Sequence, residues 1–174
     1  MKNKLHWLAG LLDGEGHFGI SVTNSTNRTY DFRPLIVIEM LKDCWLEEAI
    51  SIYKHFNIKY QYTERYTVNN RLACKLIINE SKGIKILCDL LNDKLILKQK
   101  HSCILKKFTY GRVIKTCNRY GLKWIDWELL NSKLNNLSSI RELNKTNNKY
   151  IHTKDSILEF YNSIKLSLPR GIKK

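Results

Sequence analysis

A short segment near the N-terminus holds residues whose types and spacing could do chemistry, and it reads Leu8-Ala9-Gly10-Leu11-Leu12-Asp13-Gly14-Glu15-Gly16. Gly10 and Gly14 are four residues apart and would share one face of a helix. Glycine costs about 1 kcal/mol relative to alanine inside a helix. The pair therefore indicates that another backbone comes very close, as in small-xxx-small helix pairs. That neighbour would be the same helix of a second copy of the chain.

Such a pairing would bring the carboxylate of Glu15 next to a twofold axis and close to its counterpart. Carboxylate oxygens and the backbone carbonyl of Gly14 suit hard divalent cations such as Mg²⁺. Two such ions beside a phosphodiester can activate a water and stabilise the leaving oxygen. The alternative is a helix that ends in glycine and carries an incidental acid. For two glycines taken alone, that alternative is the better interpretation.

The patterns around this segment predict the elements that must position it. A helical spacing of leucines gives way to a period of two after Gly16. The first elements expected are a helix at 4–14, a strand at 17–23, a strand at 30–39 made irregular by Pro34, a helix opened by Asp43, and a hairpin over 59–78 that turns at Asn69-Asn70.

Further helices are expected at about 81–91, 98–109, 122–136 and 153–166, with Thr153 capping the last. The order αββαββα, followed by helices, predicts an α+β fold with one antiparallel sheet. Because no proline- or glycine-rich linker interrupts the chain, we expect a single domain over 1–174. Its core would span about 4–109, and a basic helical part about 110–174.

One face of the expected sheet must pack on helices, and the other carries polar side chains. Hydroxyl, amide and cationic groups suit base edges and phosphates in a DNA major groove. The candidates are Ser21, Thr23, Gln61, Thr63, Arg65, Arg71 and Lys75, with Arg28 and Arg33 as further cations of the first hairpin. On the pattern alone, an ordinary solvated face is the simpler interpretation.

The charge of the chain favours a polyanionic partner. The formal net charge is +14 and the pI is about 9.6. Residues 98–174 carry 17 basic and 5 acidic side chains, a net of +12. Lysine and arginine displace the counterions condensed on phosphates, so the second half is the expected backbone clamp. Charge alone fits a merely basic, soluble protein equally well.

The nine residues 8–16 resemble the LAGLIDADG motif of homing endonucleases, with Gly14 in place of alanine and Glu15 in place of aspartate. The order of elements over residues 4–166 is also similar to that family. The resemblance implies an αββαββα core, a saddle-shaped antiparallel sheet that binds DNA, and C-terminal helices. It also implies an intron-encoded enzyme that acts as a homodimer and cuts both strands of a long, roughly palindromic DNA site.

The resemblance assigns roles to individual residues of the motif. The last acid binds the catalytic metal, which here is Glu15, and the preceding residue, Gly14, supplies a backbone carbonyl. Asp13 is implied to cap or brace paired helices. The implied dimer interface consists of Leu8, Gly10, Leu11, Asp13 and Gly14. The implied cofactor is Mg²⁺, with Mn²⁺ as a substitute and Ca²⁺ supporting binding without turnover.

Two other segments are similar to the family. Leu97-Lys98-Gln99-Lys100 resembles an L-K-Q-K helix start and implies that Lys98 lies in the active-site pocket near the scissile phosphate. The segment 144–149 resembles a loop that grips the DNA backbone, which implies a role for Lys145 and Lys149. Taken alone, each segment is also typical of a solvated, lysine-rich surface.

One catalytic position leaves two alternatives. A polar residue that helps to hold metal or water usually ends the second strand in this family. Alignment by strand period places Glu39 there, whereas alignment by the following Lys42-Asp43 places Leu41 there. Leu41 could not perform that role, so we favour Glu39 on its chemistry.

Other classes of protein have less support. The five cysteines and five histidines show no zinc spacing, and we expect the cysteines to be reduced. The sequence has neither an apolar run of membrane-spanning length nor a signal peptide, so we expect an intracellular protein, cytoplasmic in a prokaryote or organellar if organelle-encoded, with no membrane partner. Two rival functions remain: an intron RNA maturase, and a DNA-binding protein of the same fold that has lost cleavage.

Overall fold

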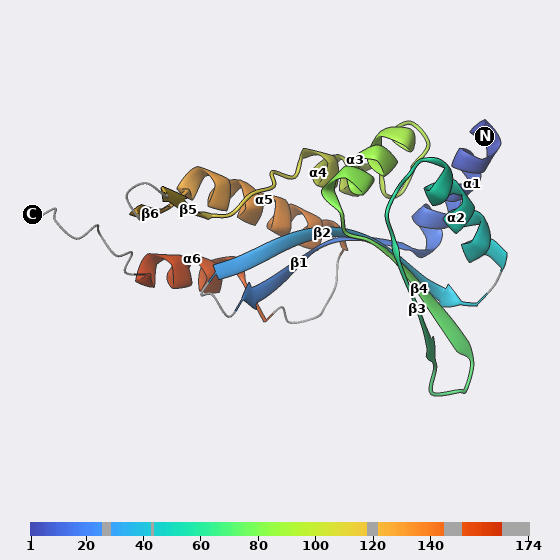
Figure 1. The fold of residues 1–174 in the computed structure, drawn as a ribbon, viewed down its shortest axis with the longest axis horizontal. Helices are drawn as coiled ribbons and strands as arrows, with labels where there is room; N and C mark the ends of the chain where they lie inside the picture. Colours follow the sequence, from blue (N-terminus) through green and yellow to red (C-terminus); the bar gives the residue numbers. More distant parts are fainter. Residues whose placement is uncertain (26–28, 43, 118–121, 145–150, 165–174) are drawn as a thin grey trace, which may run out of the picture. The chain divides into compact units, whose positions relative to one another are not determined.

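The computed structural model describes residues 1–25, 29–42, 44–117, 122–144 and 151–164. In this part of the chain the helices are α1 (Lys2–Glu15), α2 (Cys44–His55), α3 (Ser81–Leu90), α4 (Gln99–Lys107), α5 (Trp127–Asn144) and α6 (Lys154–Ser163). The strands are β1 (Gly16–Ser25), β2 (Thr29–Leu41), β3 (Gln61–Tyr66), β4 (Leu72–Ile78), β5 (Ile114–Cys117) and β6 (Leu122–Ile125) (Figure 1).

The chain divides into two compact units. The first consists of Met1–Ser21 and Arg33–Phe108, and the second of Val22–Phe32 and Thr109–Lys174. Helices α1 to α4 and the β3–β4 hairpin belong to the first unit, while the β5–β6 hairpin, α5 and α6 belong to the second. The residues expected to do chemistry, Glu15, Glu39 and Lys98, therefore all lie in the first unit.

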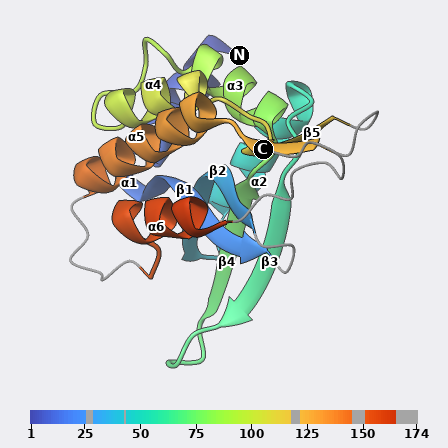
Figure 2. The same cartoon turned by 90° about the vertical axis from the view of Figure 1, so that its left-hand side faces the viewer.

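The larger sheet has four strands in the order β1-β2-β4-β3. Antiparallel pairing sets Glu39 of β2 opposite Lys75 of β4, and Lys75 opposite Thr63 of β3. Asn70, in the turn between β3 and β4, has a positive φ of 55°, a conformation that asparagine tolerates better than most residues. In both views the turn of this hairpin lies at the end away from α3 (Figures 1 and 2).

The two faces of the sheet in the first unit differ in burial, as the sequence pattern predicts. Alternate residues of β2 and β4 point into the core because successive side chains of a strand face opposite sides. The buried set is Ile36, Ile38, Cys74, Leu76 and Ile78. Apolar stripes of the helices complete this core with Leu8, Leu12, Leu46, Ile52, Ile84, Leu87 and Leu105. The opposite face is left to Glu39, Thr63, Lys75 and their neighbours.

One sequence-based expectation about the second unit is wrong. The helix expected at 122–136 begins only at Trp127, and Leu122–Ile125 instead forms strand β6, which pairs with β5. Asp126 decides the boundary because its Oδ1 accepts the backbone N–H of Leu129 at 2.9 Å, as an N-cap does. Of the preceding residues, Trp124 is aromatic and Ile125 is β-branched, both types that favour strands, and Leu122–Ile125 pairs with Ile114–Cys117.

The expected cap of the last helix is confirmed. Thr153 caps α6: its hydroxyl accepts the N–H of Ser156 at 3.1 Å, and the Ser156 hydroxyl accepts the N–H of Thr153 at 3.0 Å. Cys74, Cys88 and Cys103 are free thiols. No helix in the described part of the chain is both long and apolar enough to cross a membrane.

Candidate active site

The end of α1 is fixed by a glycine that no other residue could replace without movement. Gly16 donates its N–H to the carbonyl of Leu12, and a Cβ built on Gly16 would lie 2.3 Å from that oxygen. The chain can therefore pass directly from α1 into β1. Glu15, the last helical residue, is exposed.

The local electrostatics at Glu15 favour a cation. The last turn of α1 carries Asp13 and Glu15 but no basic residue. The C-terminus of a helix has a partial negative charge that repels carboxylates and attracts cations by about 0.3–1 kcal/mol. Among the described residues, Glu15 has no ion-pair partner. The Glu15 carboxylate and the carbonyls of the last turn are hard oxygen donors, so they fit a divalent ion that takes its other ligands from water and phosphate.

Asp13 ties the end of α1 to the start of α4. Its Oδ2 accepts the N–H of Ile96 at 2.7 Å, and its Oδ1 accepts those of Leu97 at 3.1 Å and Lys98 at 2.8 Å. These three donors precede α4 and come from a segment more than 80 residues away in sequence. Asp13, which was expected to cap or brace paired helices, thus accepts hydrogen bonds from the Lys98 segment of its own chain.

We expect Asp13→Asn to destabilise the fold by about 1–3 kcal/mol, because hydrogen bonds to charged groups are the strong ones and the new amide N–H would face backbone donors. Urea unfolding followed by circular dichroism measures the change. Lys98→Met is the matched control: it keeps all three backbone donors and should alter stability by less than about 0.5 kcal/mol. Equal stability of Asp13→Asn and wild type would show that these bonds contribute nothing.

A cluster of cationic and imidazole side chains lies just beyond the motif. His17, the second residue of β1, has its pKa lowered, first by partial desolvation of the ring and then by the positive charges of Lys98 and Lys75. Three elements, β1, β4 and the start of α4, therefore bring these groups into mutual electrostatic range. Such an arrangement attracts phosphate. His17 was not among the residues singled out from sequence, although its place two residues after Glu15 was a usable signal.

Glu39 lies on the same open face of the sheet. Its Oε2 is 3.4 Å from Nζ of Lys75, and its Oε1 accepts a hydrogen bond from the guanidinium of Arg65. Lys75 therefore acts on both Glu39, through this ion pair, and His17, through its positive charge. The alternative residue, Leu41, is exposed and opposite Ala73. Glu39 and Leu41 are two residues apart on β2 and share one face of the sheet, so the choice of Glu39 still rests on its chemistry.

Several residues of the polar face expected from sequence lie on one side of β3 and β4. Gln61, Thr63 and Arg65 of the edge strand β3 are all exposed, and they alternate with side chains of the opposite face. Arg71 is exposed and lies in the turn before β4, where its N–H donates to Thr67 Oγ1 at 3.1 Å. Lys75 completes the row, half-buried at the centre.

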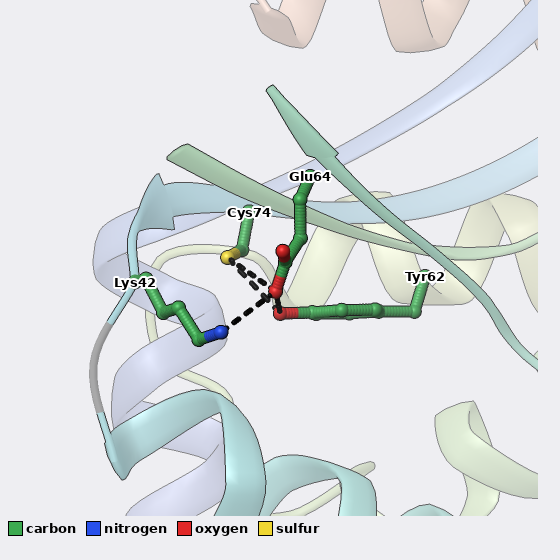
Figure 3. Close-up of polar contacts among 4 residues, drawn as sticks. All are labelled: Lys42, Tyr62, Glu64 and Cys74. Atoms are coloured by element: carbon green, nitrogen blue, oxygen red, sulfur yellow. Dashed lines mark hydrogen bonds and ion pairs between the residues drawn. The ribbon is translucent and has the colours of Figure 1, made fainter. Parts of the chain in front are cut away.

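A network on the other side of β3 and β4 holds this face outward. Figure 3 shows Lys42, Tyr62 and Cys74 gathered around Glu64. The Glu64 Oε1 accepts from Lys42 Nζ at 2.9 Å and from the Tyr62 hydroxyl at 2.6 Å, and that hydroxyl is 3.1 Å from Cys74 Sγ. The hydrogen bonds from Tyr62 and then Lys42 lower the pKa of Glu64. With Tyr62 and Glu64 engaged here, the residues between and beside them must face the opposite side.

The contacts described above do not involve the remaining candidates that the structure describes. Ser21 is half-buried at the edge of the first unit, Thr23 is exposed in the second, and Arg33 is exposed. Arg28, Lys145 and Lys149 lie outside the described residues. Within one chain, the described residues contain no group of three or more histidine, cysteine or acidic side chains able to hold a metal ion.

The face of α1 that carries the two glycines is open. Gly10 and Gly14 are exposed, and a Cβ built on either would meet no atom within 4 Å. Leu8 and Leu11, which the motif resemblance placed in the dimer interface, are buried in the core of their own chain, at 0% and 7% exposure. Their side chains are therefore turned away from the glycine face.

A family model described as LAGLIDADG endonuclease matches residues 8–110, which span α1, the larger sheet and the Lys98 segment. The chain belongs to the LAGLIDADG endonuclease family. Membership in this family supports a DNA endonuclease. It also places Asp13, Glu15, Glu39 and Lys98 of the candidate site within the matched region.

Solved structures agree on the fold of this LAGLIDADG chain. The homing endonuclease I-CvuI, in complex with the I-CreI target and Mg, has a TM-score of 0.68 and 14% identity over 92% of this chain and 94% of its own. The archaeal intron-encoded homing endonuclease I-Vdi141I, complexed with DNA, gives 0.66 and 14% over 92% and 95%. The group I intron-encoded I-CeuI, complexed with DNA, gives 0.65 and 14% over 92% and 77%. No curated protein sequence matches the chain.

Proposed function

We propose that this protein is an intron-encoded homing endonuclease that cuts both strands of a long, roughly palindromic DNA site by metal-dependent phosphodiester hydrolysis. The observation that carries the proposal is the constellation around α1: an exposed Glu15 that has no ion-pair partner among the described residues, and a Lys98 segment tied to the same helix end through Asp13. The similar structures that were solved on DNA, one with Mg and one with Ca, support a duplex substrate and a divalent cofactor.

We assign the roles as follows. Glu15, with the carbonyl of Gly14, would hold Mg²⁺, with Mn²⁺ as a substitute and Ca²⁺ as an ion that permits binding without turnover. When bound, this ion supplies Lewis-acid stabilisation and an activated water. Lys98 offers a positive charge to the scissile phosphate, and that charge, after partial desolvation of the ring, lowers the pKa of His17. Glu39, which pairs with Lys75 and Arg65, would help to hold metal or water.

DNA would lie on the open face of the sheet. Gln61, Thr63, Arg65, Arg71 and Lys75 present donors and acceptors of the kinds that read base edges and hold phosphates. We extend the surface to Ser21, Thr23, Arg28 and Arg33 of the first hairpin and to Lys145 and Lys149. The exposed Glu15 favours this proposal over a DNA-binding protein without cleavage and over an RNA maturase, neither of which needs that acid.

A plasmid library with long randomised inserts tests the proposal. Incubation with Mg²⁺ should linearise a small subset of plasmids, and sequencing of their ends should return one site with approximate twofold symmetry. Omission of the metal should leave all plasmids supercoiled. Absence of any metal-dependent linear or nicked product over the whole library would refute an endonuclease.

We also propose a homodimer, formed by α1 and its twofold mate through the open face at Gly10 and Gly14. Gly10→Leu should block this approach and give a monomer at micromolar concentration by sedimentation velocity. The variant chain itself should fold, because leucine is favoured over glycine in a helix by roughly 1 kcal/mol. Ser51→Leu, a change on the exposed side of α2, is the matched control and should stay dimeric. A wild-type monomer with full cleavage activity would contradict the proposal.

A further inference from the structure

The β5–β6 hairpin of the second unit is a short ribbon with a fixed base. The N–H of Asp126 donates to the carbonyl of Val113 at 2.9 Å, and Val113 is buried. Asp126 also caps α5 through Leu129. The hairpin and the start of α5, including Trp127, are therefore held together by one residue.

Large aromatic rings on this ribbon are exposed. Trp124 is 49% exposed and Trp127 is 41% exposed. Apolar side chains of this size are normally mostly buried in a folded chain, and both are available here to a ligand with a flat apolar surface.

Basic residues lie on both faces of this ribbon and just before it. Lys115 lies directly opposite Trp124 in the register, so both side chains share one face of the ribbon. Lys123 is exposed on the other face, opposite Thr116, and Arg112 is exposed just before β5. Lys115 Nζ is 3.7 Å from Asp126 Oδ2, and with the Lys115 side chain 39% exposed this contact leaves the ammonium open to a second anion.

We propose that the β5–β6 hairpin, with Trp124 and Trp127, is a second nucleic-acid site that takes unpaired nucleotides. Exposed aromatic rings in a cationic setting bind single strands because bases stack on the rings while lysine and arginine pair with phosphates. A duplex keeps its base faces stacked on one another, so it offers no ring surface to an indole without costly unstacking. The site is separate in its residues from the open face that we assign to duplex DNA.

Trp45 is a control residue within the same chain, because its ring is exposed to a similar extent but lies outside the hairpin. Trp45, on α2, is 47% exposed, almost the same as Trp124, and its ring centroid is 6.0 Å from that of Trp7. Its neighbours in sequence, Glu47 and Glu48, are acidic. Trp45 therefore has a ring of similar exposure close in sequence to two carboxylates, one of which is paired with Lys4, and it should not bind a polyanion.

The test uses the full chain with labelled oligothymidylate and oligouridylate of about 15 nucleotides, in low salt, with fluorescence anisotropy as the readout. The double variant Trp124→Ala/Trp127→Ala should lose about tenfold or more in affinity for single strands, since each stacked base contributes measurably. Trp45→Ala should bind as wild type does. Binding should quench tryptophan emission in the wild type and in Trp45→Ala but not in the double variant.

The outcomes separate the alternatives. If the double variant loses affinity for both oligonucleotides, the hairpin is a general site for unpaired nucleotides. If it loses affinity for oligouridylate alone, the proposal stands and the ligand is RNA. Equal affinities of the double variant and Trp45→Ala would overturn it. An equal loss of affinity for duplex DNA would also overturn the proposal, because the hairpin would then be part of the surface that binds duplex DNA. If the double variant unfolds, Lys123→Glu, a change at an exposed position, must lower single-strand affinity for the proposal to stand. Failure here leaves duplex cleavage untouched, so it is distinguishable from failure of the endonuclease.

Discussion

Glu15→Gln is expected to abolish DNA cleavage while affinity for DNA stays within about threefold of wild type. The amide keeps the shape of the carboxylate and loses the charge that holds a divalent ion. Even residues that only support metal ligands cost about 10–100-fold when mutated, so the loss at the ligand itself should exceed about a hundredfold. Binding should survive because the open sheet face and the basic second half of the chain supply it.

The measurement pairs a cleavage time course in Mg²⁺ with a gel shift in Ca²⁺. Glu159→Gln, the same change at an exposed residue of α6, is the matched control and should cleave as wild type does. Wild-type cleavage by Glu15→Gln would show that the motif is structural in this chain and that the active site lies elsewhere. Loss of binding together with cleavage would mean that Glu15 supports the fold.

Affinity for duplex DNA is expected to fall by about 10³–10⁵ between roughly 50 and 200 mM salt, as for a protein that contacts 6–10 phosphates. The net charge of +14, most of it in residues 98–174, displaces condensed counterions on binding, and added salt opposes their release. Anisotropy titrations at several salt concentrations give the slope of log affinity against log salt. A flat dependence would remove the case for an electrostatic clamp.

Variants that remove selected charges test which lysines cause the salt dependence. Neutralising Lys145 and Lys149 together should weaken all DNA sequences about equally and flatten the slope, because phosphate contacts carry no base information. Lys82→Gln, at an exposed position of α3, is the control and should leave the slope unchanged. A variant that changed the preferred site instead of the slope would assign Lys145 or Lys149 to base readout.

Much of the fold was predictable because its signals are local. The helical spacing of leucines and the period of two after Gly16 predicted α1 and β1, and Asn70 and Thr153 occupy the turn and cap that their chemistry favours. The second unit differs from prediction: strand β5 and the two-stranded sheet were not expected, and residues 122–125 were expected to be helical. The wrong helix came from extending a helical pattern across Asp126, a residue that caps α5. Asp126 stops the extension because its side chain satisfies the first backbone donors of α5.

What the sequence determined by itself was the family, the order αββαββα, the acid at Glu15 and the basic second half. Only the tertiary structure decided which residues act on one another. Asp13 bonds to the Lys98 segment, Glu39 pairs with Lys75 and Arg65, and the charges of Lys98 and Lys75 act on His17. The physical reason is separation along the chain. Side-chain period and turn chemistry act over a few residues, whereas contacts across more than 80 residues depend on strand register and on how helices bury their apolar stripes.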